Sequence, residues 1–408
     1  MQYVIIGNSA AAIGAVEGIR RTDARGKIII ISDEPYHTYA RPLISYLLLG
    51  KTTEEKMKYR GDDFYERNHC QVYLSVRATA IDAREKTVSL SDGRIISYDK
   101  LLIATGSSPF VLPIPGADTV EEKFTFMTLA DAKKLGEAVN QESRVLILGA
   151  GLIGLKCAEG ILCRAGQITV VDLAPTVLSS ILDPEGARMV QEHLEHNGLK
   201  FILSQAIKSI DHNTATLNSG EKVEFDIFVM AVGVRPNIQL FEGLGELGRG
   251  IPVNEKSETS CADIYAAGDC TESFDISSGQ RKILAILPNA YMQGECAGVN
   301  MAGGAAKFTQ AMPMNAIGFC GLHVMTAGTY SGESYIVQDE NGYKKLFYGD
   351  TLNGYILIGK IDQAGIYTNL IRDKAPLDTL DFALICQQPG LIAFTREQRT
   401  EMLGGVSR

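Results

Sequence analysis

The fold of this chain is decided by residues 144–172, which begin RVLILGAGLIG (144–154) and end in QITVVD (167–172). Val145 to Leu148 form a short apolar run, typical of a strand that is buried on both faces of a parallel sheet. Glycines follow at G-x-G-x-x-G spacing and lead into a helical run. A second apolar run, Ile168 to Val171, ends at Asp172. Strand, glycine turn, helix, strand and terminal acid in this order predict a dinucleotide-binding fold.

Each position of this motif has a physical role in binding a dinucleotide. The first glycine permits a tight turn, the second lets the backbone approach a pyrophosphate, and the third allows helix and strand to pack closely. The helix N-terminus offers unpaired N–H groups to the phosphates, and the terminal carboxylate can bind a ribose 2′-hydroxyl. The four residues after Asp172, LAPT (173–176), include no basic side chain to meet a 2′-phosphate, so NAD(H) is favoured over NADP(H). The predicted NAD-binding residues are Gly149, Gly151, Leu152, Ile153, Gly154 and Asp172.

The N-terminus repeats the same pattern in a weaker form. A predicted strand at 3–6 runs into a turn of small residues, and a second predicted strand at 27–32 ends next to two acids. Small side chains in the turn still let the backbone approach a phosphate. The chain therefore has two predicted nucleotide folds, one that starts at residue 1 and one that starts near residue 143. The residues of the first turn that correspond to the three glycines are Gly7, Ser9 and Ala12, and the two acids are Asp33 and Glu34.

Length and composition indicate a cytoplasmic globular protein with two or three domains. The chain has 408 residues, of which 45% are hydrophobic and 21% are charged. Its net charge of −9 disfavours a nucleic acid or an anionic membrane as partner. The sequence has no basic leader, no signal peptide and no apolar run of transmembrane length, so a cytoplasmic location is expected. Eight cysteines and six histidines show no zinc or iron–sulfur spacing, and no metal site is expected.

Three further motifs end predicted strands in Gly or Asp, which is where ligands bind in parallel α/β sheets. They are ATGSSP (104–109), GVRPN (233–237) and YAAGD (265–269). In this order around the central glycine motif, they make the chain resemble the two-dinucleotide-fold FAD/NAD(P)H oxidoreductases over essentially its whole length. The segment YARPLIS (39–45) resembles the branch that contains NADH:rubredoxin reductases, nitrite reductase N-terminal domains and ferredoxin reductases.

The resemblance implies an α/β fold with two Rossmann-like dinucleotide-binding domains, as in glutathione reductase, and a C-terminal α/β interface domain. It places a discontinuous FAD domain at 1–112 and 238–310, an NAD domain at 113–237 and the interface domain at 311–408. It also implies which residues line FAD, from the pyrophosphate and adenosine to the flavin. These residues are Gly7, Ser9, Ala12, Asp33, Glu34, Arg41, Ala78, Thr105, Gly106, Asp269, Asn289 and Ala290, and Gly233 is implied to bind NAD.

The resemblance further implies an oxidoreductase that passes electrons from NADH through FAD to a rubredoxin, a ferredoxin or an iron–sulfur partner subunit. Hydride transfer between the two cofactors needs no side-chain acid, base or nucleophile, so no catalytic residue is predicted. Residues 35–60 contain no cysteine, whereas the disulfide-reductase branches carry a redox cysteine there, so thiol–disulfide chemistry is excluded. Two alternatives stay open: an NADH oxidase or peroxidase, and a non-autonomous NADH-binding module of a larger dehydrogenase. The oligomeric state is open as well.

Two positions depart from the family pattern. Tyr46 stands where related branches often carry a lysine near the flavin, and Lys156 stands where they often carry the glutamate that pairs with that lysine. The replacement of both residues indicates an altered nicotinamide pocket, with Lys156 near the carboxamide. The alternative is that Lys156 extends from an exposed helix face into solvent. Glu159, one turn later, is expected to be structural.

A basic loop is the candidate docking site for an acidic carrier protein. Lys51, Lys56, Lys58 and Arg60 lie just downstream of Arg41. A solvated loop of mixed charge is the alternative, because four acidic residues are interleaved with the basic ones.

Overall fold

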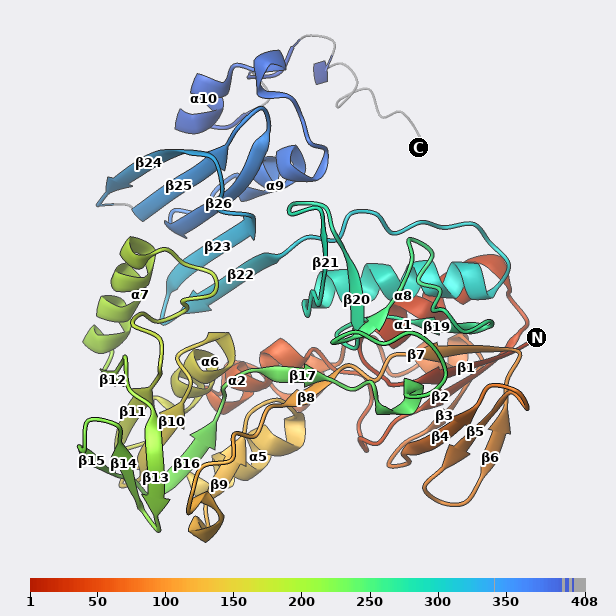
Figure 1. The fold of residues 1–408 in the computed structure, drawn as a ribbon, viewed down its shortest axis with the longest axis horizontal. Helices are drawn as coiled ribbons and strands as arrows, with labels where there is room; N and C mark the ends of the chain where they lie inside the picture. Colours follow the sequence, from red (N-terminus) through yellow and green to blue (C-terminus); the bar gives the residue numbers. More distant parts are fainter. Residues whose placement is uncertain (341, 391–392, 396–397, 400–408) are drawn as a thin grey trace. The chain divides into compact units, whose positions relative to one another are not determined.

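The chain divides into two compact units, a larger and a smaller one (Figure 1). The computed structural model describes residues 1–340, 342–390, 393–395 and 398–399. The larger unit comprises Met1–Ser180, Gln191–Phe274 and Arg281–Thr309, and the smaller unit comprises Ile181–Val190, Asp275–Gln280 and the chain from Gln310. The boundaries of the three domains remain a prediction. Within the described residues, no helix has both the length and the apolar character needed to span a bilayer.

The N-terminal part of the larger unit is built on a five-stranded parallel sheet in the order β19-β7-β1-β2-β3. Both faces of β1 are covered, since Ile5 belongs to one buried cluster and Val4 to another. Ile6 pairs with Ile31 on one side and with Ile103 on the other, so three strands end at the same edge of the sheet. The strands are β1 (Gln2–Ile6), β2 (Lys27–Ile31), β3 (Cys70–Tyr73), β7 (Lys100–Ile103) and β19 (Ile264–Ala266).

A second parallel sheet repeats this arrangement in the order β12-β11-β10-β16-β9. Its central strand, β10, pairs with β11 and β16 just as β1 pairs with β2 and β7, and Leu148 at its end pairs with Val171 and Met230. The predicted two Rossmann-like folds are therefore confirmed as an α/β architecture. The strands are β9 (Lys123–Thr125), β10 (Arg144–Leu148), β11 (Gln167–Val171), β12 (Leu199–Ile202) and β16 (Ile227–Met230).

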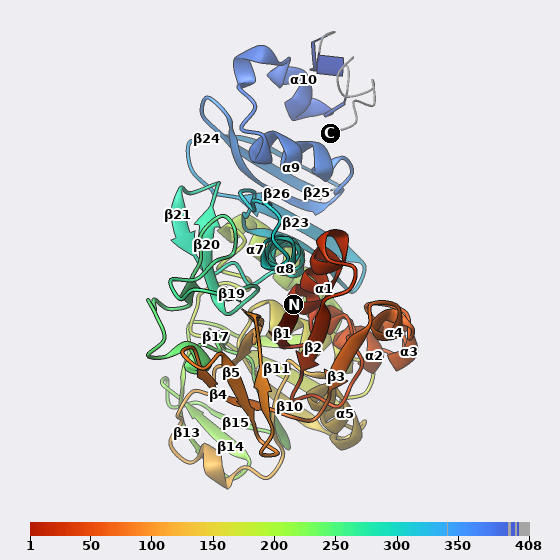
Figure 2. The same cartoon turned by 90° about the vertical axis from the view of Figure 1, so that its right-hand side faces the viewer.

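Helices cover both sheets, and the closest helix pair joins α1 (Ala10–Thr22) to α8 (Leu287–Met301). The two lie side by side in Figures 1 and 2. Glycines make this approach possible: a Cβ on Gly14 would lie 2.2 Å from the Tyr291 carbonyl oxygen, and a Cβ on Gly294 would lie 2.0 Å from that of Ala11. The remaining helices of the larger unit are α2 (Ile44–Leu48), α3 (Glu54–Met57), α4 (Phe64–Arg67), α5 (Leu129–Ala138), α6 (Leu152–Ile161) and the second half of α7 (Pro184–His196).

Short strands complete the larger unit, and β18 pairs with β20 in parallel. Each nucleotide fold carries a three-stranded antiparallel meander, which lies just before β7 in the first fold and just before β16 in the second. A two-stranded ribbon pairs the segments that follow β7 and β16. These strands are β4 (Ala78–Asp82), β5 (Thr87–Leu90) and β6 (Ile95–Ser97); β13 (Ile207–Asp211), β14 (Thr214–Leu217) and β15 (Lys222–Glu224); the ribbon β8 (Ser107–Pro109) and β17 (Val234–Pro236); and β18 (Ile251–Pro252), β20 (Thr271–Asp275) and β21 (Gln280–Lys282). Single 3₁₀ turns are η1 (Arg41–Leu43), η2 (Ala117–Thr119) and η3 (Gln239–Phe241).

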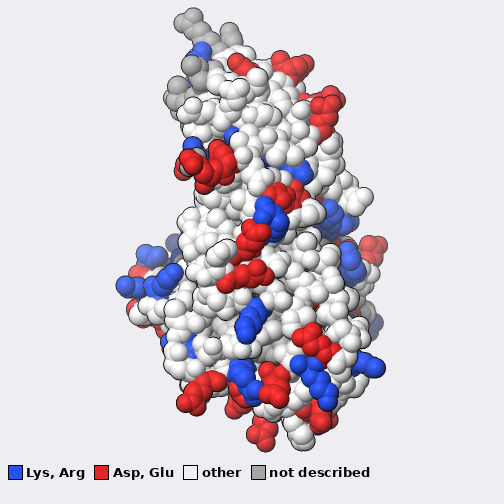
Figure 3. Space-filling view, turned by 90° about the vertical axis from the view of Figure 1, so that its left-hand side faces the viewer, with Lys and Arg blue, Asp and Glu red and all other residues white. Residues whose placement is uncertain are grey.

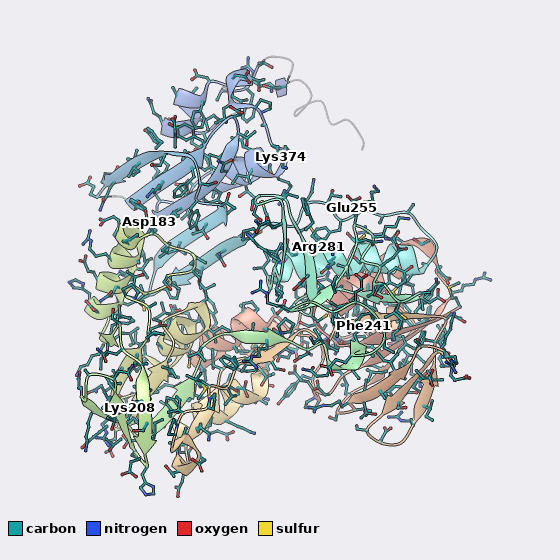
Figure 4. The ribbon with its side chains drawn as sticks, viewed as in Figure 1. Asp183, Lys208, Phe241, Glu255, Arg281 and Lys374 are labelled. Carbon is teal, nitrogen blue, oxygen red and sulfur yellow. The ribbon has the colours of Figure 1, made fainter. Side chains whose placement is uncertain are left out.

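The smaller unit is an antiparallel sheet in the order β22-β23-β26-β25-β24 with helices packed against it. Asp183, labelled in Figure 4, accepts hydrogen bonds from Tyr343 at 2.6 Å and Lys345 at 2.7 Å, which fixes residues 181–190 to β25. Its elements are β22 (Met314–Phe319), β23 (Leu322–Gly328), β24 (Glu333–Asp339), β25 (Gly342–Tyr348), β26 (Leu352–Gly359), α9 (Ala364–Arg372), η4 (Leu377–Thr379) and α10 (Phe382–Gln387). The part of the predicted interface domain at 341, 391–392, 396–397 and 400–408 lies outside the described residues.

Candidate functional site

The two glycine turns have the same geometry at their first position. Gly7 follows β1 with φ +120°, and Gly149 follows β10 with φ +115°. A Cβ on Gly7 would lie 2.1 Å from the carbonyl oxygen of Ala104, and a Cβ on Gly149 would lie 2.3 Å from that of Ala231. Each turn therefore packs against the end of the neighbouring strand, and only glycine fits at either position.

The second glycine of the central motif is required by nothing within the protein. A Cβ on Gly154 would lie 1.9 Å from the Gly149 carbonyl oxygen, so this third glycine is needed for packing. A Cβ on Gly151 would meet no atom within 4 Å. The space in front of Gly151 is therefore open to an approaching ligand, and this cradle fits the pyrophosphate of a dinucleotide. In the first fold, Ser9 takes this position and the fully buried Ala12 takes the third.

The helices α1, α6 and α8 begin without a side-chain cap, as α2, α4 and α9 also do. Ser9 before α1, Gly151 before α6 and Ile286 before α8 make no capping hydrogen bond, and none of these helices has an acid in its first turn. By contrast, Thr53, Thr128 and Asp381 cap α3, α5 and α10 through their side chains. The uncapped helices thus keep their N–H groups and positive dipole ends available, which suits anionic phosphates and an electron-rich ring edge. The predicted contacts Leu152, Ile153, Asn289 and Ala290 all lie in the first turn of such a helix.

The acids at the ends of the second strands differ in their partners. Asp172 accepts hydrogen bonds from the backbone N–H groups of Ala150 at 2.6 Å and Ala174 at 2.7 Å, so its carboxylate holds the glycine turn. In the first fold, Glu34 pairs with Arg41 and accepts a hydrogen bond from Tyr39 at 2.7 Å. Its neighbour Asp33 is exposed and lies 3.4 Å from Arg77. The structure thus brings Glu34 and Arg41 together and leaves Asp33 at the surface.

The strand-end motifs of the first fold converge on Asp269. The Ser107 hydroxyl donates a hydrogen bond to this carboxylate at 3.0 Å. Burial raises the pKa of Asp269, and the Ser107 hydrogen bond and the charge of Arg41 oppose this rise. The Thr105 hydroxyl donates to the Asn237 carbonyl at 2.7 Å, and the Asn237 side chain donates to the Thr105 carbonyl at 2.9 Å. These two hydrogen bonds join the segments that follow β7 and β16. Sequence reasoning missed Ser107 as the partner of Asp269, although it lies within the ATGSSP motif.

The remaining predicted positions are fixed by backbone conformation and packing. Gly106 and Gly233 have φ of +66° and +110°, and a Cβ on either would meet no atom within 4 Å. Ala78 is buried at the start of β4 and pairs with Leu90. Gln293 of α8 accepts a hydrogen bond from the Gly268 N–H at 2.8 Å, which attaches the helix to the turn that carries Asp269.

The two positions that depart from the family pattern contact each other. Lys156 of α6 pairs with Glu159, and its Nζ lies 4.4 Å from the ring centroid of Tyr46 on α2. The two charged side chains are only 13% and 5% exposed. The alternative of a lysine that extends into solvent from an exposed helix face is therefore wrong.

The basic loop is of mixed charge. Lys58 lies 2.6 Å from Glu55 and also pairs with Asp62, and Arg60 makes two contacts with Glu17 at 2.7 and 3.1 Å. Acidic and basic side chains are also interspersed on the face shown in Figure 3. The structure therefore supports the mixed-charge alternative over a basic docking patch.

The cysteines form no disulfide, and four of them are buried: Cys157, Cys270, Cys296 and Cys386. Burial raises the pKa of Cys270, which follows Asp269, to about 11, and that of Cys70 to about 12. These thiols are protonated at neutral pH, so they are poor nucleophiles. Among the described residues, no group of three or more His, Cys, Asp or Glu side chains could hold a metal ion.

Known proteins resemble this chain over most of its length. A family model described as pyridine nucleotide-disulphide oxidoreductase matches residues 1–294. The chain is 31% identical over 394 residues to the NADH-dependent phenylglyoxylate dehydrogenase subunit epsilon of Aromatoleum evansii, with 93% of each chain covered. It is 27% identical over 373 residues to the NADH-rubredoxin oxidoreductase of Clostridium acetobutylicum, with 90% of each covered.

Other matches define the fold and the extent of the likeness. A chain of the covalent putidaredoxin reductase–putidaredoxin complex superimposes with a TM-score of 0.87 at 22% identity, with 95% of this chain and 96% of that chain covered. The chain spans about half the length of two Bacillus subtilis relatives, an assimilatory nitrate reductase electron transfer subunit and a nitrite reductase, each 31% identical. With the family model over residues 1–294 and a 31% identical relative matched over nearly its full length, the chain belongs to the pyridine nucleotide-disulphide oxidoreductase family.

Proposed function

We propose that this chain oxidises NADH and delivers the electrons, by way of bound FAD, to a one-electron carrier protein or an iron–sulfur partner subunit. The chain is an oxidoreductase of a family whose cofactors are FAD and NAD(H). The observation that carries the proposal is the presence in one chain of two glycine turns, each followed by an uncapped helix. Cys270, the thiol next to the predicted FAD residue Asp269, is buried and has a raised pKa. Two nucleotide sites without a redox thiol suit transfer to an external acceptor.

The first fold would hold FAD and the second would hold NAD(H). The α1 N-terminus with Gly7 and Ser9 would receive the FAD pyrophosphate, and the paired Glu34 and Arg41 would hold the adenosine end. Gly151, the α6 N-terminus and Asp172 would hold NAD(H). When bound, FAD supplies the chemistry that converts a two-electron hydride donor into one-electron steps. The protein's part is to orient the nucleotides and exclude water, and no side-chain acid or base is required.

The acceptor can be a free carrier or a tightly bound subunit, and the relatives include both kinds. The relative matched over 93% of its length is named as a subunit of an NADH-dependent dehydrogenase, and the one matched over 90% is named for rubredoxin. Purification of the untagged protein from its native source, followed by size measurement and mass spectrometry, separates the two cases. A stable complex with an iron–sulfur protein supports the subunit, and an isolated chain that reduces rubredoxin or ferredoxin supports the free enzyme.

The functional test is anaerobic turnover with NADH and a set of acceptors. We expect fast reduction of a one-electron protein carrier and slow reduction of oxygen and hydrogen peroxide, each added in turn. Faster turnover with oxygen or peroxide than with any carrier would instead favour the NADH oxidase or peroxidase alternative.

A further inference from the structure

Lys156 and Glu159 form a buried ion pair that the binding of phosphates and ribose does not explain. Their side chains are 13% and 5% exposed, and the ring of Tyr46 lies over the ammonium at 4.4 Å. Removing two charges from water costs free energy that their mutual attraction often fails to recover, so a buried pair is weak evidence for a purely stabilising role.

The pair connects α6, the helix that follows the glycine motif, to α2. Lys156 is in the second turn of α6, whose first turn carries Leu152 and Ile153 of the glycine motif. Tyr46 belongs to α2, which directly follows the turn that contains Arg41. The two helices are in close contact, since a Cβ on Gly160 would lie 3.2 Å from the Ser45 carbonyl oxygen. The face of α6 that carries Lys156 therefore points toward the FAD-binding segment.

Hydride transfer requires the nicotinamide ring to lie about 3–3.5 Å from its acceptor atom. With its pyrophosphate at Gly151, the nucleotide would have to extend toward the first fold, and Lys156 lies on the face of α6 that contacts α2. Lys156 precedes Glu159 by three residues in α6, so its backbone lies about one turn nearer to the glycine turn. The ammonium is therefore the end of the pair that a nucleotide bound at Gly151 would reach first.

We infer that Lys156 is a positioning residue that faces the nicotinamide ring. Its charge favours NADH, whose ring is uncharged, over NAD⁺, whose ring is cationic. This inference rests on the proposed function, because it requires NAD(H) at the second fold. An ammonium near the ring repels the positive charge that the ring carries only after oxidation. Glu159 and Tyr46 hold the ammonium in place, and Glu159 offsets part of its field. The arrangement promotes release of NAD⁺ and directs the site toward NADH oxidation.

The test measures binding to the FAD-loaded protein by titration calorimetry with three ligands. Tetrahydro-NAD is an unreactive analogue of NADH with an uncharged ring, NAD⁺ carries the ring charge, and ADP-ribose lacks the ring. We expect the native protein to bind NAD⁺ about tenfold more weakly than tetrahydro-NAD. Lys156→Gln should lower this ratio to one or below, because the remaining Glu159 carboxylate attracts the ring charge. Lys156→Arg should preserve the ratio, and Glu159→Gln should increase it.

The control is Lys200→Gln, which removes the same charge from an exposed position on β12 and should leave the ratio unchanged. ADP-ribose affinity should stay native in all four variants, which also verifies that the site is folded. Shifts of the ratio in the same direction for Lys156→Gln and Glu159→Gln, or an unchanged ratio in both, would overturn the inference and leave the proposed function intact. Failure of the native protein to bind ADP-ribose would contradict the NAD site itself.

Discussion

The two nucleotide folds share one sheet order, but their glycine turns differ at the second position of the motif. In both, the first glycine is required by the backbone of the neighbouring strand, Ala104 for Gly7 and Ala231 for Gly149. At the second position, the second fold keeps Gly151 facing open space, whereas the first fold accepts Ser9. The comparison separates glycines that the packing of the fold requires from a glycine that it does not require.

The folds also differ in how their first helix is covered. In the first fold, α1 packs along α8 with backbone against backbone at Gly14, Gly18, Gly294 and Gly298. In the second fold, α6 packs against the five-residue α2. A cofactor that stays bound suits the first arrangement, and a nucleotide that exchanges in every turnover suits the second.

The largest effect should be the loss of stability caused by Gly7→Ala, because this substitution replaces a glycine that packing requires. The new Cβ would overlap the Ala104 carbonyl oxygen at positive φ, so we expect the free energy of unfolding to fall by about 3 kcal/mol in urea titrations followed by circular dichroism. Gly93→Ala is the matched control, since Gly93 also has positive φ but a Cβ there would meet no atom within 4 Å. Its cost should be about 1 kcal/mol. Equal losses in the two variants would show that packing against Ala104 is unimportant.

Gly151→Ala should separate ligand binding from stability. No protein atom opposes the new methyl group, so the urea midpoint should stay native, while the methyl group should weaken ADP-ribose binding by about tenfold because it enters the pyrophosphate cradle. Calorimetry measures the affinity. A native affinity for ADP-ribose in this variant would show that the pyrophosphate does not bind in front of Gly151.

Asp172→Ala should reduce nucleotide discrimination and loosen the glycine turn together. The carboxylate accepts two backbone hydrogen bonds, and their loss with the ribose contact should cost NADH binding about 1–3 kcal/mol. Since NADPH makes no favourable ribose contact with an acid, the ratio of kcat/KM for NADH over NADPH should fall. Asp172→Asn keeps one acceptor oxygen and should lie between the two. An unchanged ratio in Asp172→Ala would contradict the assignment.

The smallest effect should follow thiol alkylation. Burial raises the pKa of Cys270 to about 11, so at pH 8 this thiol stays protonated and unreactive, while the exposed Cys163 reacts. The raised pKa also means that stability from the protonated Cys270 is complete below the ordinary value of 9.0 and is lost as pH rises through about 11. Treatment with N-ethylmaleimide at pH 8 should leave NADH:acceptor turnover native. Loss of turnover on modification of a single cysteine in a folded protein would restore thiol chemistry as a candidate.

The sequence predicted the parts of the fold that local rules control. The strand, glycine turn and helix of each nucleotide fold follow from apolar runs and from backbone positions that only glycine can adopt, so Gly7, Gly149 and the strand ends could be placed in advance. The predicted ligand contacts remain predictions. The structure adds that their helix N-termini are uncapped and that Gly151 faces open space.

Contacts between distant segments could not be predicted from local patterns. The Tyr46–Lys156 contact joins two helices that are far apart in the sequence, and only the family resemblance indicated that these positions pair. The Ser107–Asp269 hydrogen bond joins residues 162 positions apart. Without these partners, Lys156 was equally compatible with an exposed helix face. The role of the small residues in α8 was hidden for the same reason, because only the packed α1 explains Gly294 and Gly298.

The central claim, transfer of electrons from NADH through this flavoprotein to a carrier, is tested most directly by following the flavin absorbance under anaerobic conditions. The purified protein should be yellow, should bleach with NADH much faster than with NADPH, and should regain its colour when an oxidised rubredoxin, ferredoxin or iron–sulfur partner is added. Equal bleaching rates for NADH and NADPH, or recovery of the colour with oxygen but with no protein carrier, would contradict the account.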